Sequence, residues 1–179
     1  GGGSTDCSAA HLNALIALAR SSGPSGQVSL PGERLARREY GSLILTRGGS
    51  PPAFAPRPLV LEGETPLPGS PWRVRCRRTA CPEAGERVPG AVYLARTSLG
   101  QDALLRPRQV GDRITLPGRG GKTIKKLFID AHIPRWEREA IPVLADSRGV
   151  AAVAGFGGDH TRLAQPGEAA YELLFWKEV

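Results

Sequence analysis

Glycine and proline interrupt this chain so often that few long helices can form. Its 179 residues include 23 glycines and 16 prolines, which is above average usage but below the range of low-complexity sequences. Both residue types mark turns, and the apolar runs between them are short. We therefore expect short strands joined by turns, with helices only where glycine and proline are absent.

One such stretch is the N-terminal segment 5–20, which is predicted to be a helix with Asp6 as its N-cap. Four apolar residues recur there at helical spacing and should form one face: Leu12, Leu15, Ile16 and Ala19. A lone helix of this length is marginal in water, so it must dock on another element. Residues 1–4 read as an engineered linker and the chain has no methionine, so we expect part of a longer protein.

The remaining elements are predicted to be mostly strands. We expect them at residues 28–30, 35–38, 43–46, 59–61, 72–79, 91–96, 143–145, 150–155 and 173–179. A helix over 123–131 should bury Ile124, Leu127, Phe128 and Ala131, and a second short helix should begin at Pro134. The order of these elements along the chain is strands, then two short helices, then strands again. This order indicates an α+β fold with a β-rich C-terminal domain, preceded by one helix.

The charge of the chain favours an anionic partner. Its net charge is +7 and its pI about 9.9, which is typical of proteins that bind nucleic acid, acidic proteins or anionic membrane surfaces. There are 20 arginines and four lysines. Arginine forms the better phosphate fork, although a GC-rich genome would also favour arginine codons.

This positive charge is concentrated in residues 106–138. The segment holds three acidic residues and these nine basic ones: Arg106, Arg108, Arg113, Arg119, Lys122, Lys125, Lys126, Arg135 and Arg138. A solvated face without a partner would normally mix both signs. A second basic row is expected on the strand 72–79, where Arg73, Arg75 and Arg77 alternate with apolar residues and so share one face.

No convincing catalytic or metal site is evident. The G-x-S-x-G motif of serine hydrolases is absent. Gly121-Lys122-Thr123 imitates the end of a P-loop, but Leu116 replaces the first glycine, so only backbone contact with phosphate is kept as an option. Three cysteines favour reduced thiols over disulfides, with a zinc site of Cys7, His11, Cys76 and Cys81 as the weaker alternative.

Targeting signals are not evident either. There is no signal peptide, and no apolar run of membrane-spanning length occurs. We therefore expect a cytoplasmic protein that makes no contact with a membrane.

Several ordered motifs resemble one family. They are the segments 105–113, 125–134, 141–144 and 150–155, together with Arg138. Together they are similar to the C-terminal domain of bacterial tRNA(Ile)-lysidine synthetases. Upstream, the segments 11–18, 30–33 and 38–41 resemble the middle region of the same family more weakly.

The resemblance implies a module that holds tRNA, not a self-sufficient enzyme. The family joins lysine to the wobble cytidine of isoleucine tRNA with ATP. Its chemistry, with ATP and Mg²⁺, belongs to an N-terminal PP-loop domain whose S-G-G-x-D-S signature is absent here. The family's C-terminal domain is associated with holding tRNA, including the acceptor stem. Its fold is similar to a β-rich domain of the phenylalanyl-tRNA synthetase β subunit.

The resemblance and the charge together give the predicted tRNA-binding set: Arg106, Arg108, Arg113, Lys122, Lys125, Lys126, Arg135 and Arg138, with Arg73, Arg75 and Arg77 as a secondary basic strand. Lys125 and Lys126 are the better candidates for phosphate contact. Arg106 and Arg113 could equally be structural, with Arg106 pairing with Asp112 to hold a loop. His132 stands where the family often has lysine, which weakens one expected contact.

We expect a helix left from a central domain at 1–26, a β hairpin and connection at 27–69, and the tRNA-binding domain at 70–179. The alternative is a domain that docks on the missing PP-loop half and stabilises it without touching RNA. The sequence leaves homodimer formation open.

Overall fold

The computed structural model describes residues 8–22, 25–32, 34–39, 41–47 and 54–178. The chain divides into two compact units, Gly1–Ser50 and Pro51–Val179, which are described separately. The domain boundaries predicted after residues 26 and 69 do not coincide with this division and stay a prediction. The N-terminal helix and the strands that follow it share one small core, whereas Phe54 and Leu67 belong to the core of the second unit.

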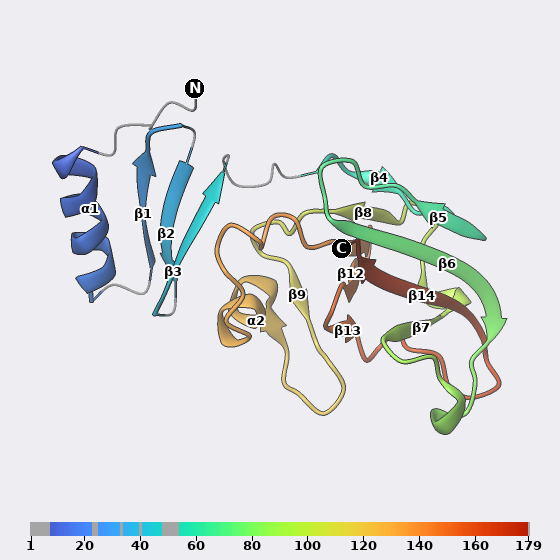
Figure 1. Ribbon diagram of the computed structural model, residues 1–179. Helices are drawn as coiled ribbons and strands as arrows, with labels where there is room; N and C mark the ends of the chain where they lie inside the picture. Colours follow the sequence, from blue (N-terminus) through green and yellow to red (C-terminus); the bar gives the residue numbers. More distant parts are fainter. Residues whose placement is uncertain (1–7, 23–24, 33, 40, 48–53, 179) are drawn as a thin grey trace. The chain divides into compact units, whose positions relative to one another are not determined.

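The first unit is one helix on a three-stranded antiparallel sheet. Its elements are α1 (Ala9–Arg20), β1 (Ser25–Leu30), β2 (Arg34–Glu39) and β3 (Ser42–Arg47), with strand order β1-β2-β3 (Figure 1). The three predicted strands are confirmed. The helix begins at Ala9 with Ser8 as its N-cap, and the Ser8 N–H donates to His11 Nδ1 at 3.2 Å. The expected cap, Asp6, lies outside the described residues.

The buried side of α1 differs in part from the predicted face. Five apolar residues form the core of this unit: Leu15, Leu18, Val28, Leu30 and Ala36. Leu12 is 58% exposed and Ile16 is 40% exposed, whereas Leu18 is 7% exposed. Leucines and alanines surround most of this helix, so periodicity could not decide which side would meet β1 and β2.

The second unit contains two larger sheets. The five-stranded sheet has the order β13-β12-β11-β8-β4, from β4 (Arg57–Pro58), β8 (Leu104–Arg106), β11 (Val143–Asp146), β12 (Gly149–Val153) and β13 (Gly157–Gly158). The four-stranded sheet has the order β5-β6-β14-β7, from β5 (Gly63–Thr65), β6 (Trp72–Ala80), β7 (Ala91–Ala95) and β14 (Ala169–Lys177). All these pairings are antiparallel.

The smaller elements connect and cover these sheets. A two-stranded ribbon is formed by β9 (Arg113–Ile114) and β10 (Lys122–Thr123), and α2 (Ile124–Asp130) follows it directly. Two short 3₁₀ turns are η1 (Ala84–Glu86) and η2 (Arg96–Ser98). One hydrophobic core joins both sheets to α2, with Val74, Leu105, Phe128, Leu144 and Leu173 fully buried.

Most of the predicted elements of this unit are confirmed. On β6, Trp72, Val74 and Cys76 are buried and alternate with the arginines. On α2, Ile124, Leu127 and Phe128 are buried as expected, but Ala131 is exposed beyond the end of the helix. The hairpin of β11 and β12 and the final strand β14 were also predicted. The described residues therefore show the expected β-rich α+β fold, with two α-helices.

Two predicted elements are wrong. Residues 59–61 are not a strand, because the Val60 N–H donates to Thr65 Oγ1 at 2.9 Å and turns the chain between β4 and β5. The segment that begins at Pro134 is a series of turns and not a helix. Its N–H groups reach back three residues, from Glu137 to Pro134 and from Ala140 to Glu137, so no α-helical ladder forms.

Candidate nucleic-acid interface

The loop from β8 to β9 is locked by a carboxylate. Arg106 donates from both terminal nitrogens to Asp112, at 2.7 and 2.9 Å, and the Gln109 N–H donates to Asp112 Oδ2 at 2.6 Å. Gly111 has φ +92°, a conformation that glycine adopts readily. Bidentate hydrogen bonds of this kind fix the relative orientation of the two side chains and also add stabilising energy. The structure therefore contains the Arg106–Asp112 pair that the structural alternative for Arg106 requires.

This lock should be visible in the pH dependence of stability. Burial alone would raise the pKa of Asp112, but hydrogen bonds from Arg106 and Gln109 outweigh it and lower the pKa. Because the pKa is lower in the folded state, the carboxylate stabilises the fold at pH values above its ordinary pKa of 3.8. This stabilisation is lost as the pH falls below that value. Asp112→Asn should thus lower the free energy of unfolding by roughly 1–3 kcal/mol at pH 7. The difference in stability between the variant and the unmodified chain should become smaller toward pH 3.

Urea unfolding at the two pH values measures this effect. Asp130→Asn is the control, since Asp130 forms surface ion pairs and should give a much smaller change. A gap for Asp112→Asn that stays constant between pH 7 and pH 3 would show that the carboxylate charge is not what locks the loop.

The turns that follow α2 contain the predicted residues Arg135 and Arg138 and pair with a third, Arg108 of the β8–β9 loop. Arg108 pairs with Glu139 at 2.6 Å, and Arg138 Nε donates to the Ile133 carbonyl at 2.9 Å. Arg135 is exposed. His132 is also exposed and has φ +55° immediately after the helix. This part of the basic segment is therefore partly engaged in holding its own backbone.

The ribbon and α2 form one connected surface. Arg113 lies opposite Thr123 across the ribbon, and the Ile124 N–H donates to the Asp112 carbonyl at 2.9 Å. Thr123 caps α2 by accepting from the Lys126 N–H at 3.2 Å. Because Ile124, Leu127 and Phe128 face the core, Lys125 and Lys126 are directed to solvent, as the sequence predicted.

The cations of this surface, the ribbon–helix surface of residues 113–130, outnumber its acids. Asp130 accepts from Lys122 at 2.6 Å and from Lys126 at 3.1 Å, and Lys126 remains 66% exposed. Among the residues described, the Arg113 side chain forms one hydrogen bond, to the Gly121 carbonyl at 3.4 Å. Within the described parts of the chain, the exposed side chains of Arg119 and Lys125 form no hydrogen bond or ion pair. A single carboxylate therefore faces five cations.

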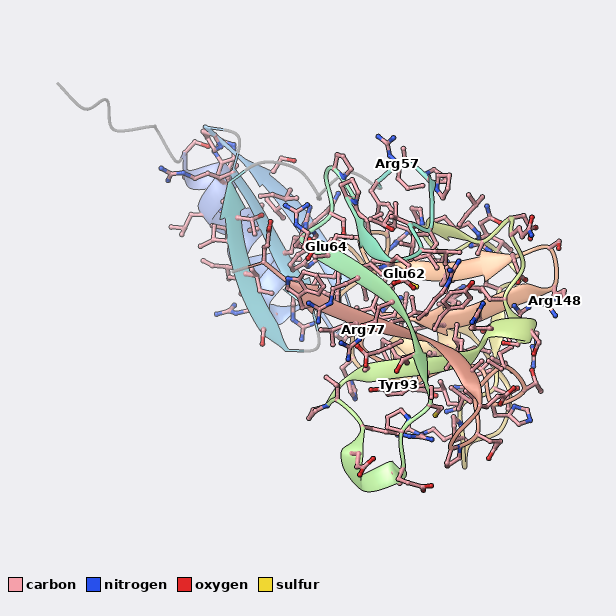
Figure 2. All side chains as sticks on the ribbon, turned by 90° about the vertical axis from the view of Figure 1, so that its right-hand side faces the viewer. Arg57, Glu62, Glu64, Arg77, Tyr93 and Arg148 are labelled. Atoms are coloured by element: carbon pink, nitrogen blue, oxygen red, sulfur yellow. The ribbon has the colours of Figure 1, made fainter. Side chains whose placement is uncertain are left out.

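The secondary basic strand is largely neutralised. Arg73 pairs with Glu178 at 2.6 Å and Arg77 pairs with Glu172 at 2.7 Å. Figure 2 shows Arg77 and Tyr93 close together on the four-stranded sheet, where the Tyr93 hydroxyl donates to Glu172 at 2.9 Å. Burial alone would raise the pKa of Glu172, but these hydrogen bonds lower it. Arg75 is exposed and, among the residues described, has no such partner.

Sequence reasoning missed the acids that pair with these arginines. Glu139, Glu172 and Glu178 lie 31, 95 and 105 residues from their partners. No local spacing could reveal them. Arg119 was counted in the basic segment but not placed in the predicted site, although the structure leaves it exposed at the tip of the ribbon.

Other candidate chemistry finds little support. Cys76 and Cys81 are buried free thiols, and burial raises the pKa of Cys76 to about 11; Cys7 lies outside the described residues. In the described ranges, no group of three or more His, Cys, Asp or Glu side chains could hold a metal. No helix within them has the length and apolar character needed to cross a membrane.

Comparisons with known proteins agree on one family. The family model described as TilS substrate C-terminal domain matches residues 104–175. The tRNA(Ile)-lysidine synthase of Geobacillus kaustophilus is 28% identical over 182 residues, which cover 94% of this chain and 37% of that protein. The bifunctional protein TilS/HprT of Listeria monocytogenes serovar 1/2a is 30% identical over 142 residues, which cover 78% of this chain and 22% of that protein.

A solved structure shows the same fold. The crystal structure of a TilS C-terminal domain superposes with a TM-score of 0.61 at 24% identity, covering 70% of this chain and 98% of that one. The chain spans between 22% and 37% of the length of these two curated relatives. Residues 104–175 therefore form a TilS substrate C-terminal domain, and over 94% of its length the chain is similar to a tRNA(Ile)-lysidine synthase.

Proposed function

We propose that this chain is the tRNA-binding C-terminal part of a tRNA(Ile)-lysidine synthase. The observation that carries the proposal is the ribbon–helix surface, where Arg113, Arg119 and Lys125 are exposed. Asp130, the one acidic residue in the sequence from 113 to 130, is bonded to Lys122 and Lys126 instead. Exposed cations on a surface of one sign attract the phosphates of a folded RNA. Family membership indicates that this RNA is tRNA.

In this proposal the chain binds the tRNA and does not catalyse the ligation reaction. Basic side chains displace counterions from the RNA backbone, and the free energy of their release drives binding. A-form RNA is recognised mainly through its shape and backbone, so sequence specificity should be modest. The ligation of lysine to the wobble cytidine of isoleucine tRNA belongs to a separate PP-loop domain, which would hold ATP and Mg²⁺ in the cytoplasm.

Within this surface the predicted residues should differ in importance. Lys125 and Lys126, followed by Arg113, are the strongest candidates for phosphate contact. Arg106 and Arg108 should contribute less, because their guanidinium groups already bond to Asp112 and Glu139. Lys122, Arg135 and Arg138 remain in the proposed set, and Arg75 is the strongest candidate of the secondary strand.

Salt dependence tests the proposal directly. We expect affinity for an unmodified isoleucine tRNA to fall roughly a hundredfold between 50 and 200 mM salt if about four phosphates are contacted. A DNA duplex of equal charge serves as the control and should bind more weakly. Binding that is insensitive to salt, or equal for both ligands, would contradict a tRNA-holding role.

One observation favours a second candidate, docking on the catalytic half of the same enzyme. Val110 is 100% exposed on the locked loop beside the Arg108–Glu139 pair. A protein partner could cover such an apolar tip. Titration of this chain with a separately produced PP-loop domain would show tight binding without RNA if docking is its role.

A further inference from the structure

The tip of the β9–β10 ribbon projects from a fixed base. Residues 117–121 are all exposed, and Figure 1 shows this loop extending from β9 at the lower edge of the second unit. At the base, the Thr115 N–H donates to Asp159 Oδ2 at 2.9 Å and the His160 N–H donates to the Thr115 carbonyl at 2.8 Å. Leu116 is 6% exposed. The base is therefore held by the body while the tip stands in solvent.

The tip is narrow and carries one charged side chain. Gly118, Gly120 and Gly121 have no side chains to cover their peptide groups. The Arg119 N–H closes the turn on the Leu116 carbonyl at 3.0 Å, and Gly118 has φ +68°. In the portion of the chain described, the Arg119 guanidinium has no partner. The Arg119 guanidinium thus presents five N–H donors at the tip. They lie beside the glycine backbone, in which the Gly121 carbonyl already accepts from Arg113.

These groups match the shallow groove of an RNA helix. The minor groove of A-form RNA is wide and displays 2′-hydroxyls, whereas its major groove is too deep and narrow for side chains. A 2′-hydroxyl can accept from a guanidinium and donate to a carbonyl. B-form DNA has no 2′-hydroxyl, and its minor groove is about 6 Å wide. The same tip would therefore find more partners on RNA than on DNA.

We infer that residues 117–121 form a finger that enters the minor groove of a double-stranded RNA stem, where Arg119 distinguishes RNA from DNA. The inference rests on the proposed function and adds to it the structural element that the chain recognises. Lys125 and Lys126 hold phosphates of either nucleic acid, so they set overall affinity. The finger sets the preference between RNA and DNA.

Two variants test the finger by different means. Arg119→Ala removes the donors, and Gly120→Leu widens the tip without changing its charge. A Cβ at Gly120 would meet nothing within 4 Å, so the second variant should fold normally. Matched controls are Arg57→Ala, which removes an exposed arginine of β4, and Gly85→Leu, at an exposed glycine that is equally open.

Binding is measured by fluorescence anisotropy with a short RNA duplex and a DNA duplex of the same sequence. Each finger variant should weaken RNA binding roughly tenfold, leave DNA binding nearly unchanged and bring the RNA-to-DNA preference close to one. The controls should keep the preference of the unmodified chain. Gly120→Leu should also keep the salt slope, because it removes no charge.

The outcomes separate this inference from the proposed function. If both finger variants keep the RNA-to-DNA preference while Lys125→Glu/Lys126→Glu weakens binding, the finger is overturned and the tRNA-holding role stands. If Arg119→Ala weakens RNA and DNA equally, Arg119 is an ordinary phosphate contact and the finger is again wrong. If the unmodified chain binds neither RNA duplex nor tRNA, both proposals fail.

Discussion

Replacing Lys125 and Lys126 by glutamate should weaken tRNA binding about a hundredfold at low salt, because two phosphate contacts are lost and replaced by repulsion. Both lysines are exposed in the first turn of α2. The slope of log affinity against log salt should become shallower by about 2, or roughly 0.9 for each phosphate. Titrations of labelled tRNA at several salt concentrations would measure both quantities.

The double variant should remain folded. Acidic residues are favourable near a helix N-terminus, and a glutamate at position 126 would complete a capping box with Thr123, whose side chain already accepts from the N–H of residue 126. The lost Lys126–Asp130 pair lies on the surface and contributes little. Circular dichroism and thermal unfolding should therefore match those of the unmodified chain.

A control with the same change of charge shows whether location matters. Arg57→Glu/Arg96→Glu alters two exposed arginines outside the ribbon–helix surface. Figure 1 shows β4, which carries Arg57, at the upper edge of the second unit and well separated from α2. The Arg96 guanidinium lies over the ring of Tyr171, with its Cζ 5.9 Å from the ring centroid. If the control weakens binding as much as the lysine variant, net charge determines affinity and the proposed surface is wrong.

Among the single substitutions proposed for this chain, removing the buried carboxylate of Asp146 should cause the largest loss of unfolding free energy. Its side chain is 0% exposed and receives two hydrogen bonds from Arg162, at 2.7 and 2.9 Å, and one from the Gly100 N–H at 2.8 Å. Arg162 is itself 8% exposed. Asp146→Ala would leave a buried guanidinium without its partner, which costs roughly 3–5 kcal/mol. Urea unfolding at pH 7 measures this loss.

A second variant separates the charge from the packing. Asp146→Ala/Arg162→Met removes both charges, so it should be more stable than Asp146→Ala alone. Asp130→Ala, at a surface carboxylate, is the control and should change stability far less. A loss below about 1 kcal/mol for Asp146→Ala would show that water or a neighbour compensates Arg162.

The same pair predicts sensitivity to acid. Burial alone would raise the pKa of Asp146, but hydrogen bonds from Arg162, Gly100 and Arg148 lower it to about 2, from 3.8. The stabilisation is complete above pH 3.8 and is lost as the pH falls toward 2, and it amounts to about 2 kcal/mol. In unfolding curves between pH 5 and pH 2, the double variant should lose less stability than the unmodified chain by about this amount, because Asp112 and Glu172 still contribute to both.

Local patterns in the sequence determined much of the fold. The alternation of Trp72, Val74 and Cys76 with arginines predicted β6, because side chains alternate between the two faces of a strand. The spacing of Ile124, Leu127 and Phe128 predicted α2 and, with it, the solvent-facing position of Lys125 and Lys126. The position of the basic segment along the chain was also predicted, because it depends only on the order of the charged residues.

Which of these charges are available to a partner depends on contacts between residues that are distant in the sequence. Arg77 is neutralised by Glu172, 95 residues away, because β14 lies beside β6. Arg108 pairs with Glu139, 31 residues away, in the turns that the chain forms after Pro134. The buried side of α1 depended likewise on where β1 and β2 lie. Pairing and burial join residues that are distant in sequence, whereas periodicity reports only on neighbours within a few residues.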